Sequence, residues 1–136
     1  MPPIRLLIAD DHETFRRSVR TLIQEQEPDW EIAAEVTDGK AAVAKAKVLK
    51  PDVAILDIVM PALNGLDAAE QIVKLSPRTK VLISTLHKTN QLFQKILAAR
   101  ARGYILKTYA DRDLIMAVKA VLSNKTFFPG HPEVGL

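Results

Sequence analysis

An apolar segment that ends abruptly on a carboxylate constrains the fold of this chain more than any other stretch. Residues 52–61 read Asp-Val-Ala-Ile-Leu-Asp-Ile-Val-Met-Pro. The proline fixes its own φ and disfavours helical geometry in the preceding residue, so the segment cannot continue as a helix. We therefore predict a buried strand that ends at Asp57. Ligands bind at the carboxyl ends of strands in open α/β sheets, which makes Asp57 a candidate site residue.

Four further apolar segments have the pattern of buried strands, and amphipathic segments separate them. Near-continuous apolar runs are typical of parallel strands that helices cover on both faces. The five predicted strands are residues 4–9, 32–36, 53–57, 80–85 and 103–106. Apolar residues recur at helical spacing after each strand, and Pro28, Pro51 and Pro77 end the first three of these patterns. We expect Asp111 to cap the last helix.

The alternation of five strands with five helices predicts a doubly wound α/β fold, in which helices lie on both faces of a five-stranded parallel sheet. At this size the flavodoxin-like strand order 2-1-3-4-5 is the natural candidate. In that order the first and third strands are neighbours. We therefore expect Asp10 and Asp11, which follow the first strand, to lie beside Asp57.

The composition fits one soluble domain. A length of 136 residues, with 48% hydrophobic and 26% charged residues, is ordinary for such a protein. No apolar run approaches the roughly 20 residues of a membrane helix, and we expect a cytoplasmic protein without membrane contact. The absence of cysteine excludes thiolate catalysis and sulfur-based metal sites. The net charge of +3 comes without a stripe of basic and aromatic residues, so it does not by itself indicate a nucleic-acid surface.

Polar motifs follow the first, third, fourth and fifth predicted strands, so we expect them at one edge of the sheet. The motifs are Asp10-Asp11-His12, Asp57 with Met60-Pro61 and Asn64-Gly65, Ser84-Thr85, and Lys107 after Gly-Tyr-Ile-Leu. In order and spacing they resemble the receiver domain of two-component response regulators, over roughly residues 4–123. The Asp-Asp-His motif and Leu86-His87 are most similar to the NarL/FixJ (LuxR-type) subfamily.

This resemblance implies that Asp57 accepts a phosphoryl group from a sensor histidine kinase. A carboxylate can attack phosphorus and form an acyl phosphate. Clustered carboxylates beside a phosphoryl group need a hard cation, and Mg²⁺ prefers oxygen ligands of this kind. The implied Mg²⁺ ligands are Asp11, Asp57 and the Val59 backbone carbonyl, with Asp10 acting through a bound water. Lys107 and the Thr85 hydroxyl would stabilise the phosphoryl oxygens.

The resemblance also implies how the signal leaves the site. Thr85, which is in register with the family motif, is expected to move towards the phosphoryl group, while Ser84 faces the packed side. Tyr104 is expected to rotate inward behind Thr85, which shifts a two-state equilibrium. The output face would comprise the fourth helix, the fifth strand and the fifth helix. A homodimer would form through that face or through the first and fifth helices.

Residues 1–123 are expected to form the receiver domain, and residues 124–136 a C-terminal tail or the start of a linker. Regulators of this subfamily usually continue into a helix-turn-helix domain, so DNA would be contacted only through an output domain absent from this sequence. A chain that acts by itself through protein partners is the alternative. The receiver would catalyse only the phosphorylation and dephosphorylation of its own Asp57, and would not be an enzyme in the metabolic sense.

Three other functions stay open at this stage. The first is an atypical receiver that binds partners without being phosphorylated. The second is a small hydrolase with an aspartyl-phosphate intermediate, although Val59 stands where such an enzyme would carry a second acid. The third is a flavin-binding protein, in which Asp10 and Asp11 would repel the flavin phosphate.

Three residues depart from the family pattern. Arg100 stands where glycine is usual after the fourth helix, so either that helix runs on or its end is strained. This departure leads us to hypothesise altered switching or association. Thr108 replaces a common proline after Lys107, which leaves the isomer of that peptide bond open. Val59, an apolar residue two positions after Asp57, would hinder the attacking water and lengthen the phosphorylated state.

Several conspicuous side chains have plainer interpretations. We expect His12 to cap or pack, and neither His12 nor His87 to bind a metal. Trp30, Phe127 and Phe128 are interpreted as packing groups. The arginines of the first predicted helix are expected to form a solvated face, with kinase docking near that helix as the alternative.

Overall fold

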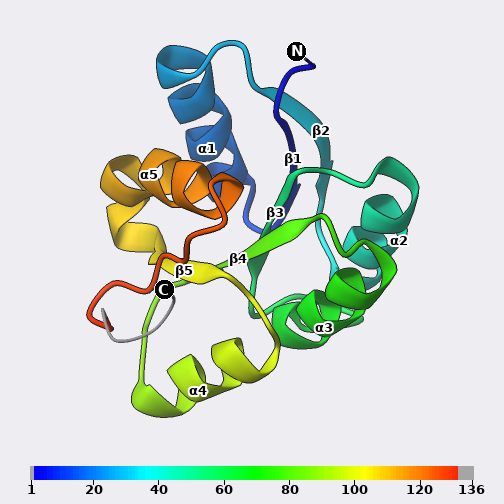
Figure 1. Cartoon of the computed structure of the whole chain (residues 1–136), viewed down its shortest axis with the longest axis vertical. Helices are drawn as coiled ribbons and strands as arrows, with labels where there is room; N and C mark the ends of the chain where they lie inside the picture. The colour runs from blue at the N-terminus through cyan, green and yellow to red at the C-terminus, as the bar shows by residue number, and fades with distance from the viewer. Residues whose placement is uncertain (1, 132–136) are drawn as a thin grey trace.

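A five-stranded parallel sheet carries the fold, and the computed structural model describes it within residues 2–131 (Figure 1). The strands are β1 (Arg5–Ala9), β2 (Glu31–Val36), β3 (Val53–Asp57), β4 (Lys80–Thr85) and β5 (Gly103–Leu106). They lie in the order β2-β1-β3-β4-β5, and every neighbouring pair is parallel. The predicted doubly wound, flavodoxin-like topology is confirmed.

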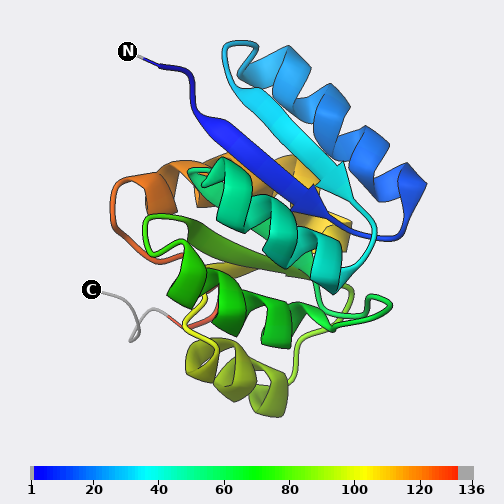
Figure 2. The ribbon, with the colours of Figure 1, turned by 90° about the vertical axis from the view of Figure 1, so that its right-hand side faces the viewer.

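Helices cover both faces of the sheet. They are α1 (Glu13–Gln26), α2 (Gly39–Leu49), α3 (Gly65–Leu75), α4 (Asn90–Ala98) and α5 (Ala110–Leu122). In Figure 2, α2 and α3 lie side by side on one face and α5 lies on the other. The buried residues of α1 and α5 form one core cluster, and those of α2, α3 and α4 form the second. Within residues 2–131, no helix has the length and apolarity needed to cross a membrane.

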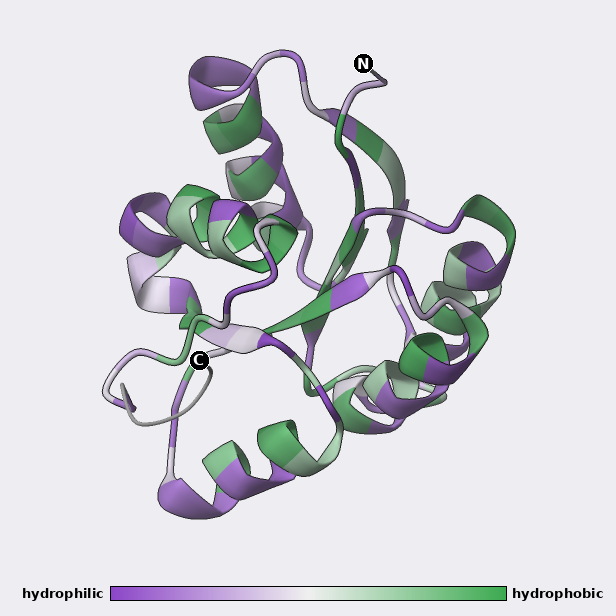
Figure 3. Cartoon of the chain, viewed as in Figure 1, coloured by the Kyte–Doolittle hydropathy of each residue, from purple (hydrophilic) through white to green (hydrophobic). Residues whose placement is uncertain are grey.

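The alternation of side chains along each strand divides the core between the two faces. Leu6 and Ile8 of β1 pack with α1 and α5, whereas Leu7 and Ala9 pack with the opposite layer, and all four are fully buried. Figure 3 shows mostly hydrophobic central strands and helices that alternate between hydrophobic and polar residues. Each buried aliphatic side chain of this size stabilises the fold by about 1.5–3 kcal/mol. In the three central strands, β1, β3 and β4, the polar residues therefore occupy only the first position or the last two.

Three of the helices have an N-cap residue whose side chain accepts a backbone N–H of the first turn. Asp38, Asn64 and Thr89 accept hydrogen bonds from the first turns of α2, α3 and α4, respectively. The prediction that Asp111 caps the last helix was wrong. A 3₁₀ turn, Lys107–Tyr109, leads directly into α5, so Asp111 lies in the first turn of that helix. Its negative charge is still favourable there because of the helix dipole.

The end of α4 is strained, which is one of the two outcomes expected at Arg100. Arg100 adopts the left-handed region with φ of 65°. Its N–H donates to Leu97 O at 3.0 Å and the next N–H, of Ala101, donates to Ile96 O at 3.3 Å. These two bonds define a Schellman cap, where glycine is the usual residue. The Lys107–Thr108 peptide bond is trans.

The chain after α5 returns to the sheet beside β5. Phe127 forms a parallel bridge with Gly103, and Tyr104 N–H donates to Phe127 O at 3.0 Å. A Cβ on Gly103 would lie 2.5 Å from Phe127 O, so this close approach requires glycine. Phe128 is 8% exposed and belongs to the core cluster of α2, α3 and α4. Phe127 and Trp30 are partly buried against the cluster on the other face of the sheet. The packing roles predicted for these aromatic residues are confirmed, whereas residues 132–136 of the predicted tail lie outside the described residues.

Candidate functional site

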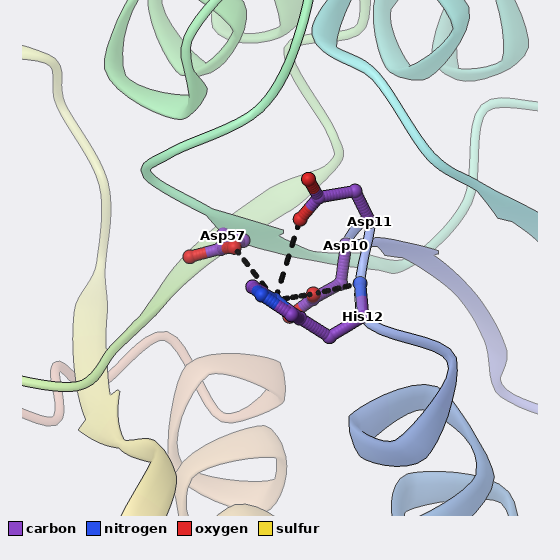
Figure 4. Close-up of side chains that lie close together, drawn as sticks. All are labelled: Asp10, Asp11, His12 and Asp57. Carbon is purple, nitrogen blue, oxygen red and sulfur yellow. Dashed lines mark hydrogen bonds and ion pairs between the residues drawn. The ribbon is translucent and has the colours of Figure 1, made fainter.

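The predicted acidic residues and Lys107 meet at the carboxyl edge of the sheet. Ala9 of β1 pairs with Leu56 of β3, so Asp10 and Asp57, the residues that follow them, lie side by side. Figure 4 shows the side chains of Asp10, Asp11 and His12 converging with that of Asp57. The edge position arises because parallel strands all end on the same side.

The loop after β3 is held against the strand by a close backbone approach. Gly65, the first residue of α3, donates its N–H to Ile58 O at 2.8 Å. A Cβ at this position would lie 1.9 Å from Asp57 O, so the glycine is a steric requirement. The Val59 side chain projects into solvent and is 76% exposed. The role of the Val59 carbonyl as a metal ligand stays a prediction.

Lys107 is the cation at the centre of the site. Its Nζ lies 2.6 Å from Asp10 Oδ2 and 3.2 Å from Asp57 Oδ2, and its side chain is 8% exposed. The same Nζ lies 4.8 Å from the centre of the Phe15 ring, within the range of a cation–π interaction. In the sequence, Phe15 belongs to the apolar pattern of the first predicted helix, which by itself indicates a packing residue. Its place one turn after the acidic pair was the available signal for a role at the site.

The surroundings of Asp57 disfavour the ionised form of its carboxyl group. Burial raises its pKa above the ordinary value, and the negative charge of Asp10 raises it further. Lys107 opposes both effects through its charge and its hydrogen bond, without cancelling them. An additional cation near Asp57 would therefore favour the ionised form.

The acidic cluster has the donor chemistry of a site for a small divalent cation. Ligand atoms of Asp10, Asp11, His12 and Asp57 all lie within 4.8 Å of one another. The three carboxylates supply hard oxygen ligands, and Asp11, with 37% of its side chain exposed, leaves the site open to solvent. The residues present therefore fit Mg²⁺, and the ligand set inferred from the sequence stays a prediction.

His12 takes part in this cluster to an extent that was not predicted. Its Nδ1 lies 3.1 Å from Asp10 Oδ1, 3.3 Å from Asp11 Oδ1 and 3.8 Å from Asp57 Oδ2. His12 is the N-cap residue of α1, as predicted, and it caps through its backbone carbonyl, which accepts the N–H of Arg16 at 3.2 Å. The ring lies against all three carboxylates.

The hydroxyl pair at the end of β4 divides between two environments. Thr85 is 8% exposed and its Oγ1 donates to the carbonyl of His87 at 3.0 Å. Ser84 pairs with Asp57 across the sheet and is 1% exposed, and its hydroxyl has no hydrogen-bond partner in the described structure. Ser84 is thus buried, as predicted. The contact of Thr85 with a phosphoryl group stays a prediction.

Tyr104 already points inward in this structure. It is 1% exposed and packs edge-on against Phe93, near Phe128. Its hydroxyl donates to the carbonyl of Pro129, and burial raises the pKa of this hydroxyl, which keeps it protonated. The segment after α5 therefore holds the aromatic side chain that the resemblance assigns to switching.

His131 extends this contact towards the edge that carries the acidic site. Its ring stacks on Phe93 with centroids 3.6 Å apart, and its Nε2 lies 2.8 Å from Lys88 Nζ. Lys88 follows Thr85 by three residues. The packed aromatic group thus joins the C-terminal segment to the loop after β4.

We predicted that the arginines of α1 form a solvated face, but this holds for only some of them. Arg16 has 11% of its side chain exposed and donates from Nη1 to Asp10 O at 2.5 Å. It also pairs with Glu35 of β2 and with Glu13, and Arg20 shares both partners. Arg17, with 70% of its side chain exposed, fits the prediction. Arg16 therefore supports the backbone of the acidic pair.

The family model described as "Response regulator receiver domain" matches residues 6–119 of this chain. The chain is 35% identical over 131 residues to the transcriptional regulatory protein DegU of Brevibacillus brevis, covering 96% of this chain and 54% of the relative. It is 36% identical to the response regulator protein VraR of Staphylococcus aureus, covering 96% of this chain and 61% of the relative. The chain thus spans little more than half the length of these relatives.

Solved structures with the same fold include a two-component response regulator of the LuxR family from an Aurantimonas species. Its TM-score is 0.85 at 28% identity, with 92% of this chain and 89% of that chain covered. The signal receiver domain of the NarL response regulator from Mycobacterium tuberculosis gives a TM-score of 0.85 at 27% identity, covering 92% of this chain and all of that one, 100%.

Proposed function

The chain belongs to the response regulator receiver domain family, and on this premise we propose that Asp57 accepts a phosphoryl group from a sensor histidine kinase. The observation that carries the proposal is Lys107, whose Nζ lies within 3.2 Å of Asp57 and within 2.6 Å of Asp10 at a buried sheet edge. Such a fixed cation suits phosphoryl transfer, which depends mainly on positioning and electrostatic stabilisation.

In the proposed transfer, a carboxylate oxygen of Asp57 attacks the phosphorus of a phosphohistidine. The P–O bond forms as the P–N bond breaks, and the leaving imidazole keeps the electron pair and takes up a proton. Lys107 neutralises one phosphoryl oxygen, and the Thr85 hydroxyl donates to another after it leaves the His87 carbonyl. This chemistry modifies the chain itself and turns over no external metabolite.

Asp11, Asp57 and the Val59 carbonyl would hold Mg²⁺, with Asp10 acting through water. When bound, the ion would offset the mutual repulsion of carboxylates and phosphoryl oxygens. The acidic cluster supports this assignment. His12, which lies against the same three carboxylates, would have to yield the space between them.

We further propose that the chain acts within a transcriptional regulator and contacts a promoter through an output domain. This proposal is supported by a relative whose sequence aligns with 96% of this chain and which is named a transcriptional regulatory protein. Dimerisation would use α4, β5 and α5, or α1 and α5. Phosphoryl transfer from the kinase and binding to the promoter would both take place in the cytoplasm. The phosphorylation-independent alternative is not favoured, because Lys107 contacts both Asp57 and Asp10, and Asp11 lies in the same acidic cluster.

Acetyl phosphate can replace the kinase in a direct test. The chain is incubated with acetyl phosphate and Mg²⁺, and its intact mass is measured. A single phosphoryl adduct is expected, which Asp57→Asn abolishes and chelation of Mg²⁺ suppresses. The matched control is Asp52→Asn, at the residue that directly precedes the same strand, and it should keep the adduct. An adduct that survives in Asp57→Asn, or none with any donor, would contradict the proposal.

A further inference from the structure

The edge of the sheet opposite the acidic site is lined with cations. Arg5 opens β1 and Lys80 opens β4, while Lys50, Arg78, Arg100 and Arg102 lie within three residues before β3, β4 or β5. These residues are spread from position 5 to position 102, so no basic stripe is visible in the sequence. Because parallel strands all begin at one edge, the fold gathers them there. We call these six residues the basic edge.

Adjoining cavities run along the basic edge. The larger has a volume of about 950 Å³ and is lined by Arg5, Lys50, Arg78 and Lys80. A second, of about 350 Å³, is lined by Arg100 and Arg102 and shares Lys80 with the first. The surface is therefore continuous from β1 to β5.

The arginines of the basic edge differ in their pairing from those of α1 and α5. Within residues 2–131 none of the four forms an ion pair with a carboxylate, whereas Arg16, Arg20 and Arg112 all do. Arg5 and Arg102 donate to backbone carbonyls instead. Asp52 lines the larger cavity, and its Oδ2 accepts the backbone N–H of Arg5 at 2.8 Å. The edge thus keeps a surplus of positive charge.

Backbone strain marks two of these cations. Lys50 has φ of 46° and Arg100 has φ of 65°, and each ends a helix in the left-handed conformation where glycine is favoured. Strained positions that a freer residue could occupy are candidates for function. Here both positions place a cation on the same edge, where glycine would contribute no charge.

We propose that the basic edge binds the phosphate backbone of double-stranded DNA. Guanidinium groups without carboxylate partners match phosphate in charge and in bidentate geometry. Protein interfaces rely on aromatic and large apolar anchors. The large apolar residues that line the two cavities are partly or fully buried, and none of the exposed large hydrophobic residues of the described chain lines either one. The choice of DNA over another polyanion rests on the proposed place of the chain in a transcriptional regulator. The contact itself requires no phosphorylation.

The test is fluorescence anisotropy of a labelled duplex of arbitrary sequence, with the unphosphorylated chain, between about 50 and 200 mM salt. The variant Arg78→Ala/Lys80→Ala/Arg100→Gly removes three cations of the edge and relieves the strain at Arg100. If each cation neutralises one phosphate, the log–log salt slope falls by about 2.7, so the wild type loses about 40-fold more affinity than the variant across this range. The control Arg17→Ala/Lys40→Ala/Lys95→Ala removes the same charge elsewhere and should bind nearly as the wild type does.

Several results would overturn the proposal: no binding by the wild type at the lowest salt, equal losses in both triple variants, or tighter binding of single-stranded RNA or polyglutamate than of the duplex. Asp57→Asn should bind DNA as the wild type does. A failure of phosphoryl transfer is therefore distinguishable from a failure of DNA binding.

Discussion

Replacing Arg100 with glycine should stabilise the protein, although it deletes a side chain. Arg100 has φ of 65° at the end of α4. The left-handed conformation costs an ordinary L-residue about 1–2 kcal/mol. Glycine avoids that cost but loses about 0.5–1 kcal/mol more conformational free energy on folding. The difference predicts a net gain of about 0.5–1 kcal/mol for Arg100→Gly.

The gain can be measured by urea unfolding and by calorimetry. For a domain of 136 residues, this gain corresponds to a rise in Tm of about 2–4 °C. Arg100→Ala is the matched control, because it removes the charge but keeps a Cβ in the strained conformation. It should show little of the gain.

A second control separates strain relief from the general effect of glycine. Ala98→Gly changes an exposed position in the last turn of the same helix, where the backbone is helical. It should destabilise the protein by about 0.5–1 kcal/mol. If Arg100→Gly were no more stable than Arg100→Ala, the attribution of strain to this residue would be refuted. If it also left phosphorylation-dependent dimerisation unchanged, the hypothesis of altered switching at this position would fall with it.

Three further expectations concern the site. The raised pKa of Asp57 favours the folded state while the carboxyl is protonated, and this contribution is lost as pH rises through the folded pKa. Asp57→Asn should therefore unfold at a higher temperature than the wild type at pH 7, by a margin that shrinks towards pH 4, and a margin independent of pH would contradict the assignment. Val59→Asn puts a polar side chain at an exposed position beside the acceptor and should shorten the half-life of the acyl phosphate in an isolated phosphoprotein, so an unchanged decay would remove Val59 as the cause of a long lifetime. Tyr104→Phe deletes the hydrogen bond to Pro129 and should cost about 0.5–1.5 kcal/mol of unfolding free energy, while Tyr109→Phe, at a position 46% exposed, should cost almost nothing.

The order of the elements could be predicted from local pattern because each strand is buried on both faces. Leu6 to Ala9 and Val53 to Leu56 are fully or nearly fully buried, so every position must be apolar, and the run itself identifies the strand. The end of such a run is equally visible, which is why Asp10 and Asp57 could be assigned to one edge. The same reasoning failed at Asp111, since a 3₁₀ turn of three residues moved the start of α5 ahead of the expected cap.

Residues that act through distant partners could not be assigned from the sequence. Phe15 has the spacing of a core residue, and its contact with Lys107 depends on tertiary packing, which brings the start of α1 beside the residue that follows β5. His12 faces three carboxylates from two strands, and Arg16 reaches Glu35 of β2. Tyr104 is held by Pro129 from a segment 25 residues further on.

The sequence by itself determined the fold class and the gathering of the acidic residues and Lys107 at one edge of the sheet, because burial imposes an apolar pattern that only strand ends interrupt. The tertiary structure alone decided which charges are neutralised. Arg16 meets carboxylates, whereas Arg78 and Arg100 meet none within the described chain, and both kinds of arginine look alike in sequence. The physical reason is that parallel strands collect their beginnings at one edge and their ends at the other. Charges separated by many tens of residues thereby become a single surface.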